Sequence, residues 1–187
     1  MASPVIGFIG LGLMGGNMVE NLQKKNFEPI VMDLSKEAVA AVVARGASEA
    51  ASAAELAAQC DIIMLCLTTS TVVEKVVYGE DGLLAGIKEG AVVIDFGTSI
   101  PASTRKIGAD LAAKGAGMVD AALGRTPTHA IDGLLNIMAA GDQETFDKVK
   151  PILDMQGENI FYMGALGAGH TTKLINNFMG MTTVCAM

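Results

Sequence analysis

The chain of 187 residues is long enough to bury one substantial hydrophobic core but short for two full domains. Hydrophobic residues make up 51% of it and charged residues 18%, which suits a buried parallel sheet better than a disordered or fibrous chain. The formal net charge of −7 excludes the positive surface that nucleic acids and anionic membranes require, so we expect neither as a partner.

The first predicted element is a strand over residues 5–9 that leads into a glycine-rich turn and a helix. The turn has the spacing Gly10-x-Gly12-x-x-Gly15. In this pattern Gly10 lets the backbone turn, Gly12 lets a pyrophosphate approach the main chain, and Gly15 lets the helix pack closely on the strand. We therefore predict a dinucleotide site formed by Gly10, Gly12, Leu13, Met14 and Gly15.

A second apolar run over residues 29–32 ends at Asp33, 18 positions after Gly15, close to the spacing of about 20 for the acidic residue of such a site. A carboxylate there accepts hydrogen bonds from ribose hydroxyls and repels a 2′-phosphate. The next two residues supply no arginine for that phosphate, although Lys36 is nearby. We predict NAD rather than NADP; a solvated turn residue is the alternative interpretation of Asp33.

Short apolar runs and amphipathic stretches alternate along the rest of the chain. We expect strands over residues 61–67, 91–96, 118–122, 134–140 and 159–163, and helices over residues 36–45, 53–59, 70–78, 101–114 and 143–155. Alternation of strand and helix predicts an α/β fold, a Rossmann-type doubly wound, mostly parallel sheet.

The three cysteines are an odd number without CxxC or metal-ligand spacing, so we interpret them as small core residues of a reducing compartment and expect no metal site. Residues 1–19 carry no charged side chain, but five glycines interrupt this apolar stretch and it has no basic start. This stretch is therefore not typical of a signal peptide. We expect a soluble, cytoplasmic protein; a processed organellar protein would have the same composition.

Ligands of such sheets bind outside the carboxyl ends of the strands, and polar residues follow several predicted strands. We assign Leu67, Thr68 and Thr98 to the cofactor, because the two threonine hydroxyls are placed to contact its ribose or nicotinamide amide. Capping of the next helix is the alternative role for such hydroxyls, and we favour it for Ser70 and Ser99.

Near the end of the chain a glycine-rich turn opens a helix in which Lys173, Asn176 and Asn177 share one face. The rest of this helix is largely apolar, so we expect the polar patch to face a cleft. There an asparagine would orient a substrate oxygen and Lys173 would exchange its proton. A solvated helical stripe is the alternative.

Four ordered motifs make the chain similar to the β-hydroxyacid dehydrogenases, the family of 3-hydroxyisobutyrate dehydrogenase and tartronate semialdehyde reductase. They are Gly7 to Gly15, Asp95-x-x-Thr98-x-x-Pro101, the strand end at Asp120-Ala121 running to Gly133, and Gly167-x-Gly169-x-x-x-Lys173-x-x-Asn176-Asn177. The resemblance implies a Rossmann-type domain, hydride transfer at a nicotinamide, and Lys173 as general acid in reduction or base in oxidation. It implies support from Asn176 and Asn177, and we place Gly169 among the cofactor-binding residues.

Most of that family has Ser-Gly-Gly after the sixth strand, where this chain has Gly124-Arg125-Thr126. This version is similar to the sulfolactaldehyde reductases, and a guanidinium fork can hold a carboxylate or a sulfonate. We therefore assign substrate binding to Gly124, Arg125 and Thr126, together with Lys173 and Asn177. Alternatively, Arg125 pairs with a local acid such as Asp120 or Asp132. His129 stands where that version has an asparagine, which weakens the assignment of the particular substrate.

Family members are two-domain proteins in which the lysine helix continues into an all-helical domain. We therefore expect residues 1–163 to be the NAD-binding domain and residues 164–187 to begin that helix. The apolar stripe from Phe178 to Met187 would lack its cover, so we expect a fragment or an incompletely represented chain. The full-length protein is expected to be a homodimer or homotetramer.

The sequence thus favours an NAD-dependent dehydrogenase or reductase that acts on a CH–OH group and interconverts a small anionic hydroxy acid and its semialdehyde. Two alternatives stay open: a non-catalytic dinucleotide-binding or sensor module, and an imine reductase-like enzyme on the same scaffold.

Overall fold

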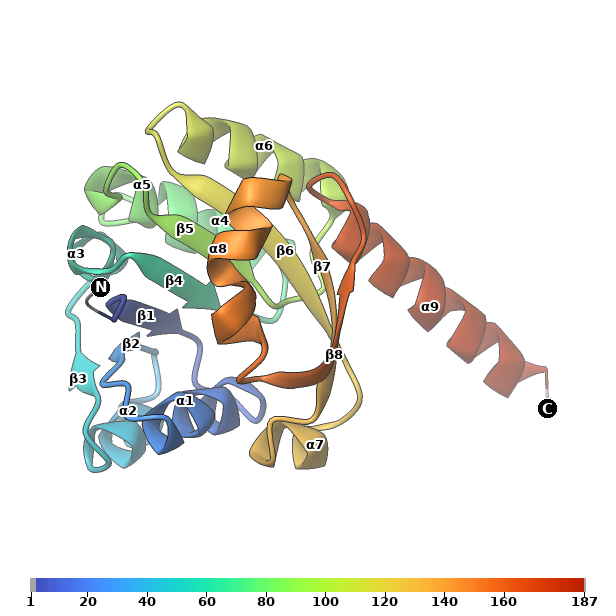
Figure 1. Ribbon diagram of the computed structural model, residues 1–187, viewed down its shortest axis with the longest axis horizontal. Helices are drawn as coiled ribbons and strands as arrows, with labels where there is room; N and C mark the ends of the chain where they lie inside the picture. Colours follow the sequence, from blue (N-terminus) through green and yellow to red (C-terminus); the bar gives the residue numbers. More distant parts are fainter. Residues whose placement is uncertain (1–2, 187) are drawn as a thin grey trace.

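The computed structural model describes residues 3–186, which form one eight-stranded sheet with helices on both faces (Figure 1). The strands are β1 (Ile6–Ile9), β2 (Ile30–Met32), β3 (Ser48–Glu49), β4 (Ile62–Leu65), β5 (Val92–Asp95), β6 (Gly117–Gly124), β7 (Leu135–Ala140) and β8 (Gly157–Tyr162). The helices are α1 (Gly15–Lys24), α2 (Lys36–Val43), α3 (Ala53–Gln59), α4 (Ser70–Tyr78), α5 (Leu83–Gly86), α6 (Pro101–Ala112), α7 (Pro127–Ile131), α8 (Gln143–Leu153) and α9 (Ala168–Cys185).

The strand order is β3-β2-β1-β4-β5-β6-β7-β8, and every neighbouring pair except β6 and β7 is parallel. This confirms the predicted mostly parallel, Rossmann-type sheet. The antiparallel pair arises because only residues 125–134 separate β6 from β7, too short a link for a parallel crossover. The strand order reverses between β1 and β4, so the ligand crevice of this fold lies beyond their carboxyl ends.

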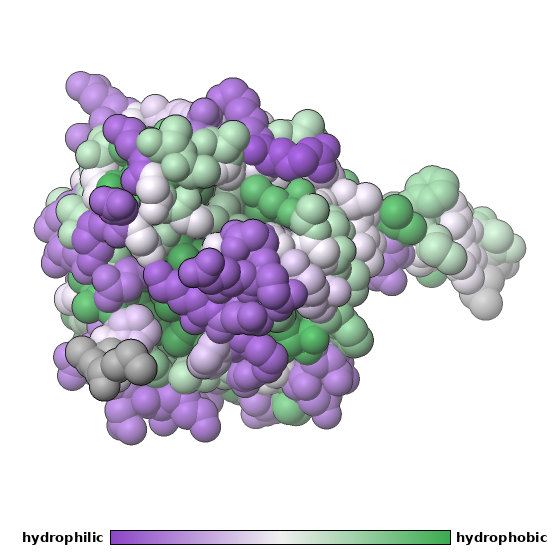
Figure 2. Space-filling model, turned by 45° about the horizontal axis from the view of Figure 1, so that its top comes forward, coloured by the Kyte–Doolittle hydropathy of each residue, from purple (hydrophilic) through white to green (hydrophobic). Residues whose placement is uncertain are grey.

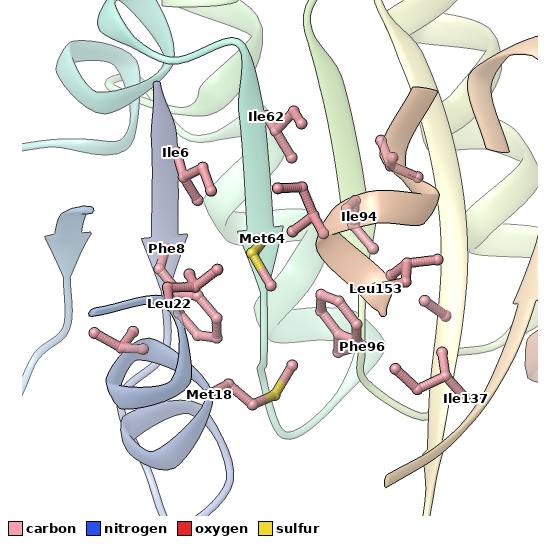
Figure 3. Packing of buried hydrophobic residues seen from close by; sticks show 14 of the residues in the cluster. Ile6, Phe8, Met18, Leu22, Ile62, Met64, Ile94, Phe96, Ile137 and Leu153 are labelled. Carbon is pink, nitrogen blue, oxygen red and sulfur yellow. The ribbon is translucent and has the colours of Figure 1, made fainter. Parts of the chain in front are cut away.

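The hydrophobic core has two layers, one on each face of the sheet. Figure 3 shows the first layer, where Leu22 of α1 and Leu153 of α8 cover Phe8, Met64 and Ile94 of the strands. The second layer lies under α3, α4, α5 and α6. Successive residues of β4 enter opposite layers, which is why the central strands read as continuous apolar runs.

Three short elements were not predicted: β3, α5 and α7. The two residues of β3, the four of α5 and the five of α7 are each too few to show a periodic hydrophobic pattern. Among residues 3–186, no helix combines the length and the hydropathy needed to span a bilayer.

The core assignment of the cysteines holds for buried Cys60 and half-buried Cys66 but is wrong for Cys185, which is exposed. The last turns of α9 project from the domain, so the side chains there have few neighbours (Figure 1). Figure 2 shows hydrophobic residues on this projecting end, which accords with the exposed side chains of Phe178, Met179, Met181 and Val184. Met187, the predicted end of this stripe, lies outside the described residues.

Candidate active site at the carboxyl edge of the sheet

The glycine turn between β1 and α1 has the geometry that its spacing predicted. Gly10 has a φ of 100°, and a β-carbon there would collide with the carbonyl oxygen of Cys66. A β-carbon at Gly15 would collide with the carbonyl oxygen of Gly10, so α1 packs directly on the turn. A β-carbon at Gly12 would meet nothing within 4 Å, which means that the backbone there faces open space.

The N-terminus of α1 faces this open space and is suited to bind an anion. Met14 occupies the N-cap position and makes no side-chain capping hydrogen bond. The positive end of the helix dipole therefore faces the turn, where the amide of Gly16 already donates to the carbonyl oxygen of Gly12 at 2.9 Å. Leu13 is 82% exposed there. These residues fit the pyrophosphate of a dinucleotide.

Asp33 joins the end of β2 to the glycine turn. Its Oδ2 atom accepts a hydrogen bond from the amide of Leu11 at 2.6 Å, and its Oδ1 atom accepts one from the amide of Ser35 at 2.7 Å. Each carboxylate oxygen can accept a further hydrogen bond, so ribose hydroxyls can still be held. Lys36, the nearby cation, is paired with Glu49 at 2.6 Å instead.

A hollow of about 530 Å³ opens beside Asp33 and is lined mainly by apolar side chains. It brings together Gly10, Asp33 and Leu67, three of the predicted cofactor residues. Val72 and Val76 of α4 also line it, and sequence reasoning missed them. The other two valines of this helix, Val73 and Val77, are buried in the core instead.

The helix caps predicted in the loops after β4 and β5 were wrong. Thr69, not Ser70, caps α4, because its extended backbone lets the hydroxyl accept from the amide of Val72. Ser70 already lies within the helix. Ile100 holds the N-cap position of α6 without a side-chain bond, so the predicted cap at Ser99 is also wrong. Thr68 and Thr98, the predicted cofactor contacts, are exposed.

Helix α9 lies across β6 and β7 on the same face as α6. Leu166, just before the helix, packs toward Met118 near the start of β6, whereas His170 binds Asp120 farther along that strand. The helix therefore advances toward the carboxyl end of β6. Lys173 lies one turn beyond Gly169, about 6 Å further at the usual helical rise.

Gly169 itself is buried against the sheet, and a β-carbon there would collide with the carbonyl oxygen of Met138. Close packing of the helix therefore explains this glycine without any ligand. Its contact with the cofactor stays a prediction to which the packing lends no support.

Lys173 is half-buried, and burial lowers the pKa of its ammonium group below the usual value. Within residues 3–186, no carboxylate lies within 4 Å of its Nζ atom to offset that effect. An amine with a lowered pKa can give up a proton more readily, which suits acid–base chemistry. Asn176 and Asn177 are exposed on the following turn.

Arg125 directly follows Gly124, the last residue of β6, and has a φ of 73°. Its Nη1 atom donates to Oε2 of Glu158 and to the carbonyl oxygen of Leu134, both at 2.6 Å. The acid beside it is therefore Glu158, and the alternative partners named from the sequence, Asp120 and Asp132, were wrong. Those acids are nearer in sequence, but β7 places the start of β8 next to Arg125.

The guanidinium group keeps donors for an anion. Within the described chain no further hydrogen bond of Arg125 is found, which leaves its Nη2 and Nε atoms unused. Thr126 lies beside it, with its hydroxyl 2.9 Å from Nδ1 of His129.

Residues 5–164 match the sequence family described as the NAD binding domain of 6-phosphogluconate dehydrogenase. The chain belongs to this family. The match includes the glycine turn and Asp33, and it confirms NAD as the cofactor of this NAD-binding domain.

Relatives of this NAD-binding domain confirm the predicted resemblance to the β-hydroxyacid dehydrogenases. A 3-sulfolactaldehyde reductase from Escherichia coli (strain K12) is 39% identical over 176 residues, which cover 94% of this chain and 59% of the relative. An NAD-dependent L-serine dehydrogenase from Pseudomonas aeruginosa is 40% identical over 172 residues, which cover 92% and 58% of the two chains. The chain thus spans about three fifths of the length of these curated relatives.

The fold of a solved relative agrees with the same conclusion. The structure of Mycobacterium tuberculosis 3-hydroxyisobutyrate dehydrogenase with L-serine superimposes with a TM-score of 0.89 at 28% identity. The superposition covers 95% of this chain and 60% of that one.

Proposed function

We propose that this chain is the cofactor-binding part of an NAD-dependent oxidoreductase that interconverts a small anionic hydroxy acid and its semialdehyde. Lys173 carries the proposal, because it is half-buried, has a lowered pKa and lies on a helix that advances toward the edge where the cofactor turn opens. A pure binding module would have no need of a proton donor there.

In this proposal bound NADH supplies the hydride, and the chain supplies the remaining interactions. The turn from Gly10 to Gly15 holds the pyrophosphate, and Asp33 holds the adenosine ribose. Thr68 and Thr98 contact the ribose or nicotinamide amide, with Leu67 beside them. NADP is disfavoured, because Asp33 repels a 2′-phosphate and Lys36 is paired with Glu49.

The substrate would bind through its anion and react at its carbonyl group. Arg125, Gly124 and Thr126 hold the carboxylate or sulfonate. Lys173 protonates the carbonyl oxygen as it becomes an alkoxide, and Asn177, with Asn176, orients that oxygen. In the oxidative direction Lys173 takes the proton back.

We also propose the division of the chain given by the sequence: residues 1–163 as the NAD-binding domain and residues 164–187 as the beginning of a helix between domains. The family match ends at residue 164, which supports this boundary. The exposed apolar side chains of α9 would then be covered by an all-helical domain in a cytoplasmic homodimer or homotetramer.

The experiment that tests the function is NADH oxidation against methylmalonate, tartronate and succinate semialdehydes, glyoxylate and sulfolactaldehyde. We expect one of these anionic aldehydes to be reduced at a higher kcat/KM than propionaldehyde, an uncharged control. The 187-residue chain and a version extended by an all-helical domain should be compared. Tight NADH binding without turnover by either version would contradict the proposal and favour a sensor module.

A further inference from the structure

Three ionisable side chains that the proposed chemistry does not use are completely buried together. Asp95 at the end of β5, Asp120 on β6 and His170 on α9 each have 0% exposure. Burying carboxylates is costly unless they are hydrogen-bonded and their charge is compensated. Their partners therefore indicate what this cluster does.

Asp95 shapes the loop that carries Thr98. Its Oδ1 atom accepts a hydrogen bond from the amide of Gly97 at 2.8 Å, and its Oδ2 atom accepts one from the hydroxyl of Ser99 at 2.7 Å. The carboxylate thus holds the residues on both sides of Thr98, which leaves that threonine exposed at the cofactor edge.

Asp120 caps α9 from a neighbouring element of the fold. Its Oδ1 atom accepts from the amide of Gly167 at 2.6 Å, and its Oδ2 atom accepts from the amide of His170 at 2.7 Å. Gly167, at the N-cap position, has no side chain to do this. The carboxylate of Asp120 therefore fixes the start of the helix that carries Lys173.

His170 lies between the two carboxylates. Its Nδ1 atom is 2.8 Å from the hydroxyl of Thr104 and 3.9 Å from Oδ2 of Asp120. Its Nε2 atom is 3.8 Å from Oδ2 of Asp95 and has no hydrogen-bond partner within residues 3–186. A proton on Nε2 would be attracted by the carboxylate of Asp95. Because His170 belongs to α9, its ring links this helix to the loop that carries Thr98.

We propose that Asp95 and Asp120 are positioning residues that hold the two halves of the active site, with His170 keeping the halves in register. Asp95 positions the cofactor loop at Thr98, and Asp120 positions α9 and thereby Lys173. The role given to Lys173 rests on the proposed function; the positioning of the loop and of the helix does not.

The variants Asp95→Asn and Asp120→Asn distinguish the two positioning roles. NADH affinity, kcat and KM are measured for each variant and for the unchanged protein. An asparagine keeps the shape but presents one NH₂ group where a carboxylate oxygen accepted a hydrogen bond. We expect Asp95→Asn to weaken NADH binding by about tenfold, the typical cost of one lost hydrogen bond. We expect Asp120→Asn to lower kcat by about 100-fold, the effect of misplacing a reacting group by about 1 Å, with NADH affinity within twofold.

Asp142→Asn is the matched control, because Asp142 is also a helix-capping carboxylate but belongs to α8. It should leave kcat and NADH affinity unchanged. If Asp120→Asn does not fold, Thr104→Val replaces it, since this change removes the partner of Nδ1 of His170 at nearly constant shape. Equal losses of NADH affinity and kcat in Asp120→Asn, or no loss of either, would overturn the proposal.

The chain has two histidines, so ¹⁵N-histidine NMR gives a readout that does not depend on turnover. We expect Asp120→Asn to shift the ring signals of His170 and to speed amide exchange at Gly167 and His170, with His129 unchanged. If the unchanged protein binds NADH but reduces no aldehyde, the proposed function fails and these readouts alone decide the positioning. Unchanged exchange at both amides would then refute it.

Discussion

Lys173 is half-buried, and this burial lowers the pKa of its ammonium group from the usual 10.5. A general acid must carry its proton, so we expect kcat for aldehyde reduction to fall as pH rises through a pKa below 10.5. Lys173→Ala should abolish turnover and leave NADH affinity unchanged. Steady-state kinetics from pH 6 to pH 10, with NADH titrations, check both; normal activity of the variant would rule out this role.

Single residues could be predicted from the sequence where their partners are local. The turn at Gly10, the close packing at Gly15 and the place of Asp33 after β2 were predicted correctly, because one turn and two adjacent strands fix their spacing. The roles of Asp120 and His170 could not be found, because the amides that Asp120 accepts from lie 47 and 50 positions away. Only the folded chain brings such partners together.

At the scale of elements, α1 supports α7, the short helix that follows Arg125 and Thr126. Asn21 of α1 is buried, and its Nδ2 atom donates to the carbonyl oxygen of Ala130 at 2.7 Å. The exposed amine of Lys24 donates to the next carbonyl, that of Ile131, at 3.2 Å. The helix of the cofactor turn thus holds the end of α7 in place.

Asn21→Leu should therefore lower the free energy of unfolding by about 1 kcal/mol, because it removes the side-chain donor and leaves the buried carbonyl of Ala130 only the longer hydrogen bond of 3.3 Å from the amide of Gly133. Urea denaturation with an unchanged m-value measures this loss. Glu20→Gln on the same helix is the control, since it breaks only an exposed ion pair with Lys24 and should cost about 0.5 kcal/mol. A loss no larger than that of the control would show that the contact contributes little.

The long elements were predicted within a few residues, because each buries one periodic face. Helix α7 was missed, although Pro127 occupies a favourable first-turn position. Five residues are too few for a hydrophobic period, and its stability comes from α1, which is distant in sequence.

At the scale of the whole molecule, acid stability depends on carboxylates whose pKa values change on folding. A hydrogen bond from Lys88 lowers the pKa of Asp61, whereas burial raises the pKa of Asp120. A lowered pKa stabilises the folded state above the unfolded value, and that stability is lost as pH falls through the folded pKa; a raised pKa acts in the opposite sense.

Removing Asp61 should therefore make the protein less sensitive to acid. We expect Asp61→Asn to have a lower Tm than the unchanged protein at pH 6 and a smaller drop between pH 5 and pH 3. Thermal melts followed by circular dichroism across this range measure the drop. Parallel Tm curves for the two proteins would contradict the role of Asp61.

The sheet as a whole could be predicted as mostly parallel, because strands and helices alternate along the sequence. Its one antiparallel pair was not anticipated, since the apolar pattern of β7 is the same whichever way the strand runs. The length of the link from β6 decides the direction, and that link was not assigned a structure.

The reversal of β7 determines which part of β8 lies next to Arg125. In a fully parallel sheet this edge would collect only the ends of strands, and Arg125 could not meet the beginning of β8. Here Gly124, Asn136 and Asn159 lie in one row across three strands, so Glu158 arrives next to Arg125. The ten residues between β6 and β7 are too few for a parallel crossover, and the reversed β7 that follows them is what brings Glu158 within 2.6 Å of the guanidinium group.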